Sequence, residues 1–247
     1  MCGIVAYIGK QEAYPIVVKG LKRLEYRGYD SSGVALSNNG VLNVYKRVGK
    51  VSNLEDFAAT QNCQGHAGIG HTRWATHGEP SDVNSHPHTS MDGKIALIHN
   101  GIIENYSSIK AELEKRGHEF RSDTDTEVLV HLIEDIYENA NVSLDEAVRL
   151  ALGEVIGAYA IVILSKEHPN ELICARKGSP IVVGVGKEKG EYFVASDATP
   201  IIEYTNNVIY LNDGEMALVR DGQLTVKTIE NQVKTPYIQE LEMKLEQ

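Results

Sequence analysis

The sequence predicts an α+β fold in which helices cover two antiparallel sheets. Apolar segments of strand length dominate both ends of the chain, and helical patterns gather between about residues 105 and 153. A parallel doubly wound sheet would require strands and helices to alternate along the chain, and they do not. Strands, then helices, then strands favour antiparallel sheets with helices packed on their faces.

The first half of the chain is expected to contain a helix among strands. Residues 2–9 are a continuous apolar run that stops at Gly9, as a buried strand does. Asn38-Asn39-Gly40 separates two strand patterns and is a typical hairpin signal. We expect strands at 2–9, 33–37, 41–47 and 66–71, and a helix at 13–24 with apolar residues at helical spacing.

Helices occupy the middle of the chain, and strands fill most of the rest. A capping pattern, Asn-Val-Ser-Leu-Asp-Glu, begins the last of the central helices. After Pro236 the chain is charged and helical in pattern, so we interpret 231–247 as the start of a linker that follows a domain at 2–230. We expect helices at 105–117, 124–139, 143–153, 198–204 and 237–247, and strands at 94–99, 157–165, 171–176, 181–186, 192–196, 207–211, 215–220 and 223–229.

Composition excludes several classes of function. The net charge of −10 argues against a nucleic-acid partner, because phosphate binding needs clustered Lys and Arg. No apolar run approaches the roughly 18 residues of a membrane helix, and no basic-then-apolar secretory leader is present. Cys2, Cys63 and Cys174 form an odd, sparse set that indicates neither a disulfide framework nor a zinc ribbon. We therefore expect a cytoplasmic protein without a membrane partner.

Cys2 is the most informative residue of the chain. If Met1 is removed, Cys2 carries both a thiol and an α-amine. The unperturbed pKa of an α-amine is about 7.7–8.0, so the free amine can take the thiol proton directly or through water. The alternative is that Cys2 is only a small buried residue at the start of the first strand.

Two polar segments lie in the first third of the chain. Glu25 to Gly33 is charged and has two glycines after a helix, which a C-cap and turn would also explain. His71 to Pro80 places Arg73 and the single Trp in an expected loop of about twenty residues, a length that is usually functional or disordered. Arg suits a carboxylate, because its fork donates two parallel hydrogen bonds. The alternative is a solvated loop in which Trp74 fills a surface gap.

Two further segments follow. Asn100-Gly101 after an apolar strand is a turn signal, but an amide donor beside a glycine N–H also has the makings of an oxyanion hole. Ser122 to Glu127 precedes a helix, where Asp125 would act as an N-cap or would bind a substrate ammonium.

The histidines raise the alternative of a metal site. His86-Pro87-His88 is superficially similar to a ligand pair, but the proline precludes the helical geometry of the familiar zinc helix. We therefore expect no metal here and no cofactor. The histidines in question are His66, His71, His77, His86, His88 and His99.

Together these segments resemble the type 2 glutamine amidotransferases, a branch of the amino-terminal nucleophile hydrolases. Within that branch they are most similar to the glutaminase domain of the glutamine–fructose-6-phosphate aminotransferases. Each motif alone is weak, but their order and spacing are very specific. The motifs are CGIV at 2–5, LEYRGYDSSG at 24–33, HTRWATHGEP at 71–80, NSHPH at 84–88, HNGIIEN at 99–105, SDTDTEV at 122–128, GAYAIVIL at 157–164, RKGSP at 176–180 and ASDATP at 195–200.

The resemblance implies a four-layer αββα sandwich and an attack by Cys2 on the side-chain amide of L-glutamine. The roles that it implies are an oxyanion hole from Asn100 and Gly101, a carboxylate clamp at Arg73, an ammonium partner at Asp125, pocket contacts from Thr76 and His77, a gate at Trp74 toward an ammonia passage, and support of the nucleophile by Arg27.

The resemblance also bears on partners. The family's full chain continues into a sugar-phosphate isomerase domain and allows a homodimer, whereas this sequence stops at Gln247. We expect this chain to release glutamate and ammonia. The full-length enzyme would use the ammonia to convert fructose 6-phosphate to glucosamine 6-phosphate. The alternatives are an amidotransferase with another acceptor, such as phosphoribosyl pyrophosphate, and a non-catalytic glutamine-sensing module.

Overall fold

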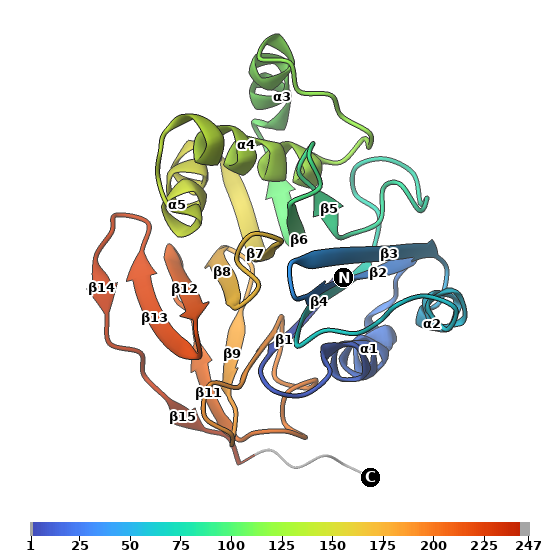
Figure 1. Cartoon of the computed structure of the whole chain (residues 1–247), viewed down its shortest axis with the longest axis vertical. Coiled ribbons are helices and arrows are strands. Elements are labelled where there is room, and N and C mark those ends of the chain that lie inside the picture. Colours follow the sequence, from blue (N-terminus) through green and yellow to red (C-terminus); the bar gives the residue numbers. More distant parts are fainter. Residues whose placement is uncertain (1, 243–247) are drawn as a thin grey trace.

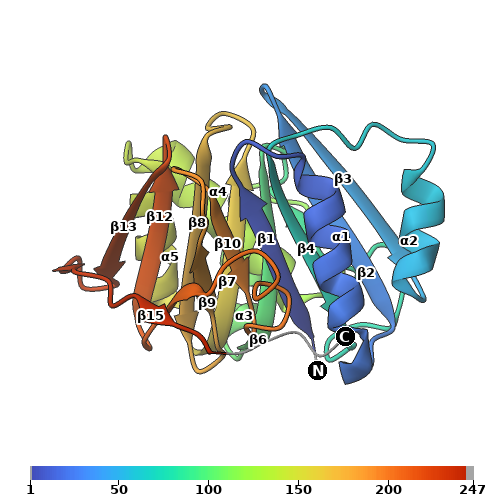
Figure 2. The same cartoon turned by 90° about the horizontal axis from the view of Figure 1, so that it is seen from below.

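The computed structural model describes residues 2–242 and consists of two antiparallel sheets packed face to face (Figures 1 and 2). The eight-stranded sheet has, in spatial order, β15 (Gln239–Glu240), β11 (Asn207–Tyr210), β9 (Val182–Val185), β10 (Tyr192–Ala195), β1 (Gly3–Ile8), β4 (Ala67–Arg73), β2 (Ser31–Asn38) and β3 (Val41–Val48). The seven-stranded sheet has β14 (Val233–Lys234), β13 (Gln223–Thr228), β12 (Glu215–Arg220), β8 (Glu171–Lys177), β7 (Gly157–Ser165), β6 (Ile95–Ile103) and β5 (His88–Thr89).

Helices cover the outer face of each sheet. The helices are α1 (Ala13–Arg23), α2 (Val51–Ala58), α3 (Tyr106–Lys115), α4 (Asp125–Asn139) and α5 (Leu144–Glu154), with a short 3-10 helix η1 (Glu25–Arg27). Helices α1 and α2 lie against the eight-stranded sheet, and α4 and α5 lie against the seven-stranded sheet (Figure 1). Their buried side chains pack on those sheets. The expected four-layer αββα sandwich is confirmed.

Side chains along each central strand point alternately to the two faces of the sheet, and those on the inner faces form the core between the sheets. Ile4, Ala6 and Ile8 of β1 face the other sheet, whereas Val5 and Tyr7 face α1. This period of two is what a strand buried on both faces requires. The layer between the sheets therefore contains strand residues, many of them alanine.

The hairpin formed by β2 and β3 is as the sequence predicts. Asn38 pairs with Val41, so Asn39 and Gly40 form a two-residue loop. Both loop residues have positive φ, 47° and 82°. These angles belong to a type I′ turn, for which Asn-Gly is the preferred pair.

Four expectations about local structure are wrong. Residues 198–204 form turns rather than a helix, and the helix expected at 237–247 is replaced by β15, with 243–247 outside the described residues. The expected loop from Thr72 to Asp92 contains the short strand β5. The strand expected at 94–99 continues to Ile103, so Asn100-Gly101 lies inside β6 rather than in a turn. Helix α2 was not expected.

Within residues 2–242, no helix has both the length and the apolar character that crossing a membrane requires.

Candidate active site

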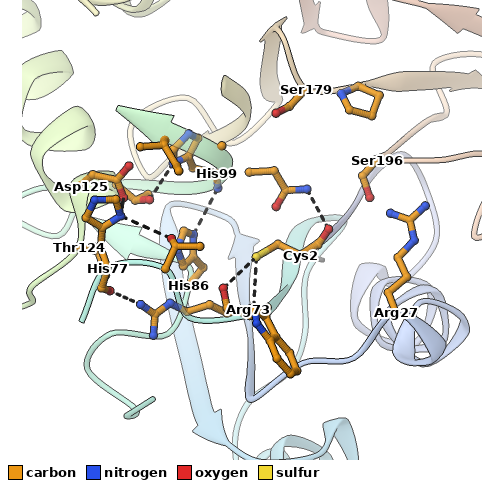
Figure 3. A pocket seen from close by; sticks show the side chains of 17 residues that line it. Cys2, Arg27, Arg73, His77, His86, His99, Thr124, Asp125, Ser179 and Ser196 are labelled. Carbon is orange, nitrogen blue, oxygen red and sulfur yellow. Dashed lines mark hydrogen bonds and ion pairs between the residues drawn. The ribbon is translucent and has the colours of Figure 1, made fainter. Parts of the chain in front are cut away.

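All nine residues that the sequence analysis selected line one cavity of about 400 Å³. Its lining includes Cys2, directly before the start of β1, and residues 100–102 near the end of β6 in the other sheet. Figure 3 shows Arg73 and Asp125 on one side of Cys2 and Arg27 on the other. The lining residues that the sequence analysis did not select are His86, His99, Ile102, Thr124, Thr126, Ser179, Pro180 and Ser196.

Cys2 directly precedes β1, and its partly buried sulfur faces the cavity (Figure 3). The backbone N–H of Trp74 donates to Sγ at 3.1 Å. Burial raises the pKa of the Cys2 thiol, against the opposing effects of the Trp74 N–H and the nearby Arg73 charge. The thiol is thus the resting form near neutral pH, and a base is needed to make it a nucleophile.

Asp30 holds the Trp74 segment beside the cysteine. Its carboxylate accepts from the Ala75 N–H at 2.7 Å, and its own N–H donates to the Arg73 carbonyl at 2.7 Å. Asp30 belongs to the polar segment Glu25 to Gly33, and no role for it is evident from the sequence.

Asn100 comes from β6, and its amide is oriented by His71. His71 Nε2 lies 3.0 Å from the His99 carbonyl and 2.9 Å from Asn100 Oδ1. A carbonyl only accepts, so Nε2 carries the proton and both oxygens share it. Nδ2 of Asn100 is thereby turned toward the Cys2 carbonyl, to which it donates at 3.2 Å. The amide donor is therefore held in place next to the nucleophile.

Buried histidines form a neutral layer behind the amide. Burial lowers the pKa of His71 to about 3, and it also lowers the pKa values of His86, His88 and His99. The rings of His71 and His86 stack with centroids 4.0 Å apart. His86 Nδ1 accepts from the His99 N–H at 3.3 Å, and His88 Nε2 lies 3.0 Å from Thr124 Oγ1. These rings are used as hydrogen-bonding and packing groups.

Gly101 is required by its backbone conformation. Its φ is +122°, and an added Cβ would lie 2.2 Å from the Ala158 carbonyl oxygen on β7. Any other residue would clash and strain the strand at this point.

Arg73 is a buried cation on the cavity wall. Its side chain is anchored by the carbonyls of His77, Gly78 and Glu79, the last two at 3.3 Å. Within the described part of the chain these are its only hydrogen-bond acceptors, and no carboxylate pairs with it. A charged guanidinium with spare donors in a cavity suits an anionic ligand.

Asp125 is the first residue of α4 and is only 4% exposed. Its Oδ2 accepts from the Ile103 N–H at 2.8 Å, and Oδ1 lies 4.0 Å from His77 Nδ1. The N-cap is Thr124, whose side chain accepts from the Glu127 N–H at 3.3 Å. Asp125 is therefore not needed as a cap, and one of its oxygens remains available to a ligand.

The remaining lining residues sit at the rim. Arg27 forms an ion pair with Asp197, and Trp74 is 54% exposed at the mouth of the cavity. Thr76 Oγ1 lies 3.5 Å from His77 Nδ1. The rim thus combines a fixed cation with an exposed aromatic ring.

Comparison with known proteins identifies the family. Residues 55–234 match the glutamine amidotransferase domain. A glutamine–fructose-6-phosphate aminotransferase (isomerizing) from Bacteroides thetaiotaomicron is 61% identical over 249 residues, covering 100% of this chain and 40% of that protein. The corresponding protein from Chlorobaculum tepidum is 55% identical over 250 residues, with the same coverage. The chain therefore spans about 40% of the length of these curated relatives.

Solved structures agree with this assignment. The glutamine phosphoribosylpyrophosphate amidotransferase of B. subtilis, complexed with ADP and GMP, is 27% identical and superimposes with a TM-score of 0.79. The match covers 92% of this chain and 49% of that one. A family match over most of the chain and a shared sandwich fold lead to one conclusion: this chain belongs to the glutamine amidotransferase domain family.

Proposed function

We propose that this chain hydrolyses the side-chain amide of L-glutamine through a thioester on Cys2. One observation carries the proposal: Cys2, directly before a strand of one sheet, and Asn100, in a strand of the other, meet in a cavity that also holds a buried cation and a buried carboxylate. Glutamine has an amide to be attacked, an α-carboxylate and an α-ammonium, so the cavity offers a group for each.

The first half of the reaction forms the thioester. After Met1 is removed, the α-amine of Cys2 accepts the thiol proton, and the sulfur attacks the amide carbon. The oxyanion that develops accepts hydrogen bonds from Asn100 Nδ2 and the Gly101 N–H, in place of the contact of Nδ2 with the Cys2 carbonyl. The protonated amine then gives its proton to the departing ammonia.

The second half releases glutamate. The same amine removes a proton from water, which attacks the thioester, and the sulfur leaves as a thiol. Arg73 holds the α-carboxylate and Asp125 the α-ammonium throughout, with Thr76 and His77 beside them. Arg27, which lies on the other side of Cys2 from Arg73 and Asp125 (Figure 3), is assigned to supporting the nucleophile.

The ammonia acceptor is fructose 6-phosphate in this proposal, and the product is glucosamine 6-phosphate. The name of the 61% identical relative supports this choice over phosphoribosyl pyrophosphate, which appears in the name of a 27% identical structure. A sugar-phosphate isomerase domain would supply the acceptor site, with 231–247 as the linker after the 2–230 domain, and Trp74 would gate the ammonia passage. The three cysteines are unpaired, which supports a reducing cytoplasm.

Glutamate release tests the proposal directly. Intact mass first establishes that Met1 is absent. Cys2→Ala should then bind glutamine without turning it over. Cys63→Ala is the control and should keep full activity, because the Cys63 thiol contacts the Ala58 carbonyl at 3.4 Å and does not line the cavity. Turnover by Cys2→Ala would refute the mechanism, and a wild-type chain that binds glutamine without turnover would favour the sensing module.

A further inference from the structure

A second cluster of side chains lies outside the active site and joins the segment after α3 to helix α4. Both helices are labelled in Figure 1. It consists of His118, directly after the turn at residues 116–117, and of His131 and Glu134 on α4. All three are buried, with exposures of 9%, 1% and 2%. None of them lines the cavity around Cys2, so the proposed glutamine chemistry does not use them.

The ligand-type atoms of this cluster converge on one point. Nδ1 of His118 lies 3.1 Å from Nδ1 of His131 and 3.6 Å from a carboxylate oxygen of Glu134. One atom from each residue falls within 4.8 Å of the other two. His131 and Glu134 are three residues apart on α4 and so lie on the same face of the helix.

The opposite nitrogen of each ring faces a carboxylate. Nε2 of His131 lies 3.5 Å from Glu127, and Nε2 of His118 lies 3.5 Å from Asp135. Glu127 is itself held by backbone N–H groups, and Asp135 by Arg116 at 2.7 Å. A histidine that binds a metal through one nitrogen usually donates its other N–H to such a partner, which fixes the tautomer and the ring.

This arrangement turns two lone pairs toward each other. If each Nε2 keeps its proton for its carboxylate, both Nδ1 atoms are acceptors, and they would repel at 3.1 Å. An ordinary hydrogen bond between the rings would require one of them to carry a second proton. A tetrahedral zinc ion with bonds of about 2.0–2.1 Å places its ligand atoms about 3.3 Å apart, close to the separation found here.

We propose that His118, His131 and Glu134 form a structural binding site for a divalent cation of the zinc class. Two imidazoles and one carboxylate with a water in the fourth position are a known zinc donor set, although it is more often found in catalytic sites than in structural ones. Here the three protein ligands are buried and lie outside the active-site cavity, so the ion would serve a structural role. The Glu134 carboxylate is held in place by the backbone N–H groups of Met91 and Asp92, which donate to it at 3.1 and 3.2 Å. Each carboxylate oxygen has two lone pairs, so it can accept such a hydrogen bond and still bind a cation.

The site would fasten α4 to the preceding turn. The N-terminal end of α4 carries Asp125 at the wall of the active-site cavity, and the metal ligands lie about two turns further along. The ion would therefore stabilise the position of α4 and take no part in the reaction at Cys2. The sequence-based expectation is that the chain has no metal site, and it weighs only histidines between His66 and His99. The proposal departs from that expectation at this cluster.

Metal binding to the chelator-treated chain tests the proposal. The Cys2→Ala background prevents the probe ion from binding the nucleophile. We expect one equivalent of Zn²⁺ per chain, and an excess of a hundredfold over the dissociation constant should raise Tm by about 5–10 °C. Co²⁺ should give the visible absorption of a tetrahedral site with nitrogen and oxygen ligands. Absence of binding at millimolar Zn²⁺ would overturn the proposal.

Variants locate the ion. His118→Gln and His131→Gln should each weaken Zn²⁺ binding at least tenfold, and Asp135→Asn, which removes an outer partner, about 10–100-fold. His168→Gln changes a histidine that contacts Tyr137 instead, and it should bind as the parent does. If a ligand variant fails to fold, anomalous diffraction at the zinc edge from the parent protein decides. Density anywhere other than among His118, His131 and Glu134 would refute the site.

Discussion

Replacing Asp125 by asparagine separates a substrate contact from a structural one. Asparagine keeps an oxygen that can accept from the Ile103 N–H, which Asp125 now holds at 2.8 Å, but it removes the negative charge. A charge-assisted hydrogen bond is worth about 1.5–3 kcal/mol. Losing that contact with the α-ammonium of glutamine should raise KM about 10- to 150-fold.

The stability of the same variant should change little. Thr124 caps α4, so the cap survives, and the lost interaction of the carboxylate with the helix dipole is worth about 0.3–1 kcal/mol. For a domain of this size that corresponds to a fall in Tm of up to about 4 °C. Glutamine titrations in a glutamate-release assay and melting curves should be measured on one preparation.

Asp145→Asn is the matched control. Asp145 is also a buried aspartate in the first turn of a helix, but it pairs with Lys227 at 3.0 Å and Arg220 at 3.1 Å, away from the cavity. Its replacement should lower Tm and leave KM unchanged. If Asp125→Asn behaves like this control, Asp125 is structural and the ammonium partner must be sought elsewhere.

The other predictions concern the nucleophile and its surroundings. Protein that retains Met1 should be inactive, because the nitrogen of Cys2 is then an amide; mass spectrometry with an activity assay checks this, and full turnover would contradict it. Asn100→Ala should lower kcat about 10²–10³-fold with a smaller effect on KM, and a change confined to KM would make Asn100 a binding residue. Arg73→Ala should raise KM about 10- to 150-fold and also lower Tm, because the side chain anchors loop carbonyls as well. Burial lowers the pKa of His71 to about 3 from 6.5, so its contribution to stability is complete above pH 6.5 and is lost as the pH falls toward 3; equal Tm values at pH 7.5 and pH 5 would contradict this.

The sequence predicts most of the fold because periodicity reports which face of an element is buried. It fails where a strand is very short or where tertiary contacts decide. The segment 51–58 has apolar residues at helical spacing, but a helix of eight residues gives a weak pattern. Residues 239–240 read as helical, yet they pair with β11 at the edge of the sheet.

The active-site residues could be selected from sequence motifs, but the hydrogen bonds between them could not be predicted. Asn100-Gly101 reads locally as a turn, and only the pairing with β7 keeps it in a strand. The contact of His71 with Asn100 spans 29 positions, and that of Asp125 with Ile103 spans 22. Local sequence patterns carry no information on contacts between residues so far apart in the chain, so these hydrogen bonds can be seen only in the structure.

The alanines between the two sheets have a consequence for how the molecule tolerates change. Ala6 on β1 and Ala96 on β6 belong to the layer that sets the spacing of the sheets. Strand β1 directly follows the nucleophile Cys2, and β6 carries the amide donor Asn100. A larger side chain there would push the sheets apart, and a misplacement of about 1 Å at reacting atoms can cost about 10²-fold in rate. Catalytic alignment, in addition to the loss of stability that overpacking causes, therefore limits which residues the middle of this protein can accept.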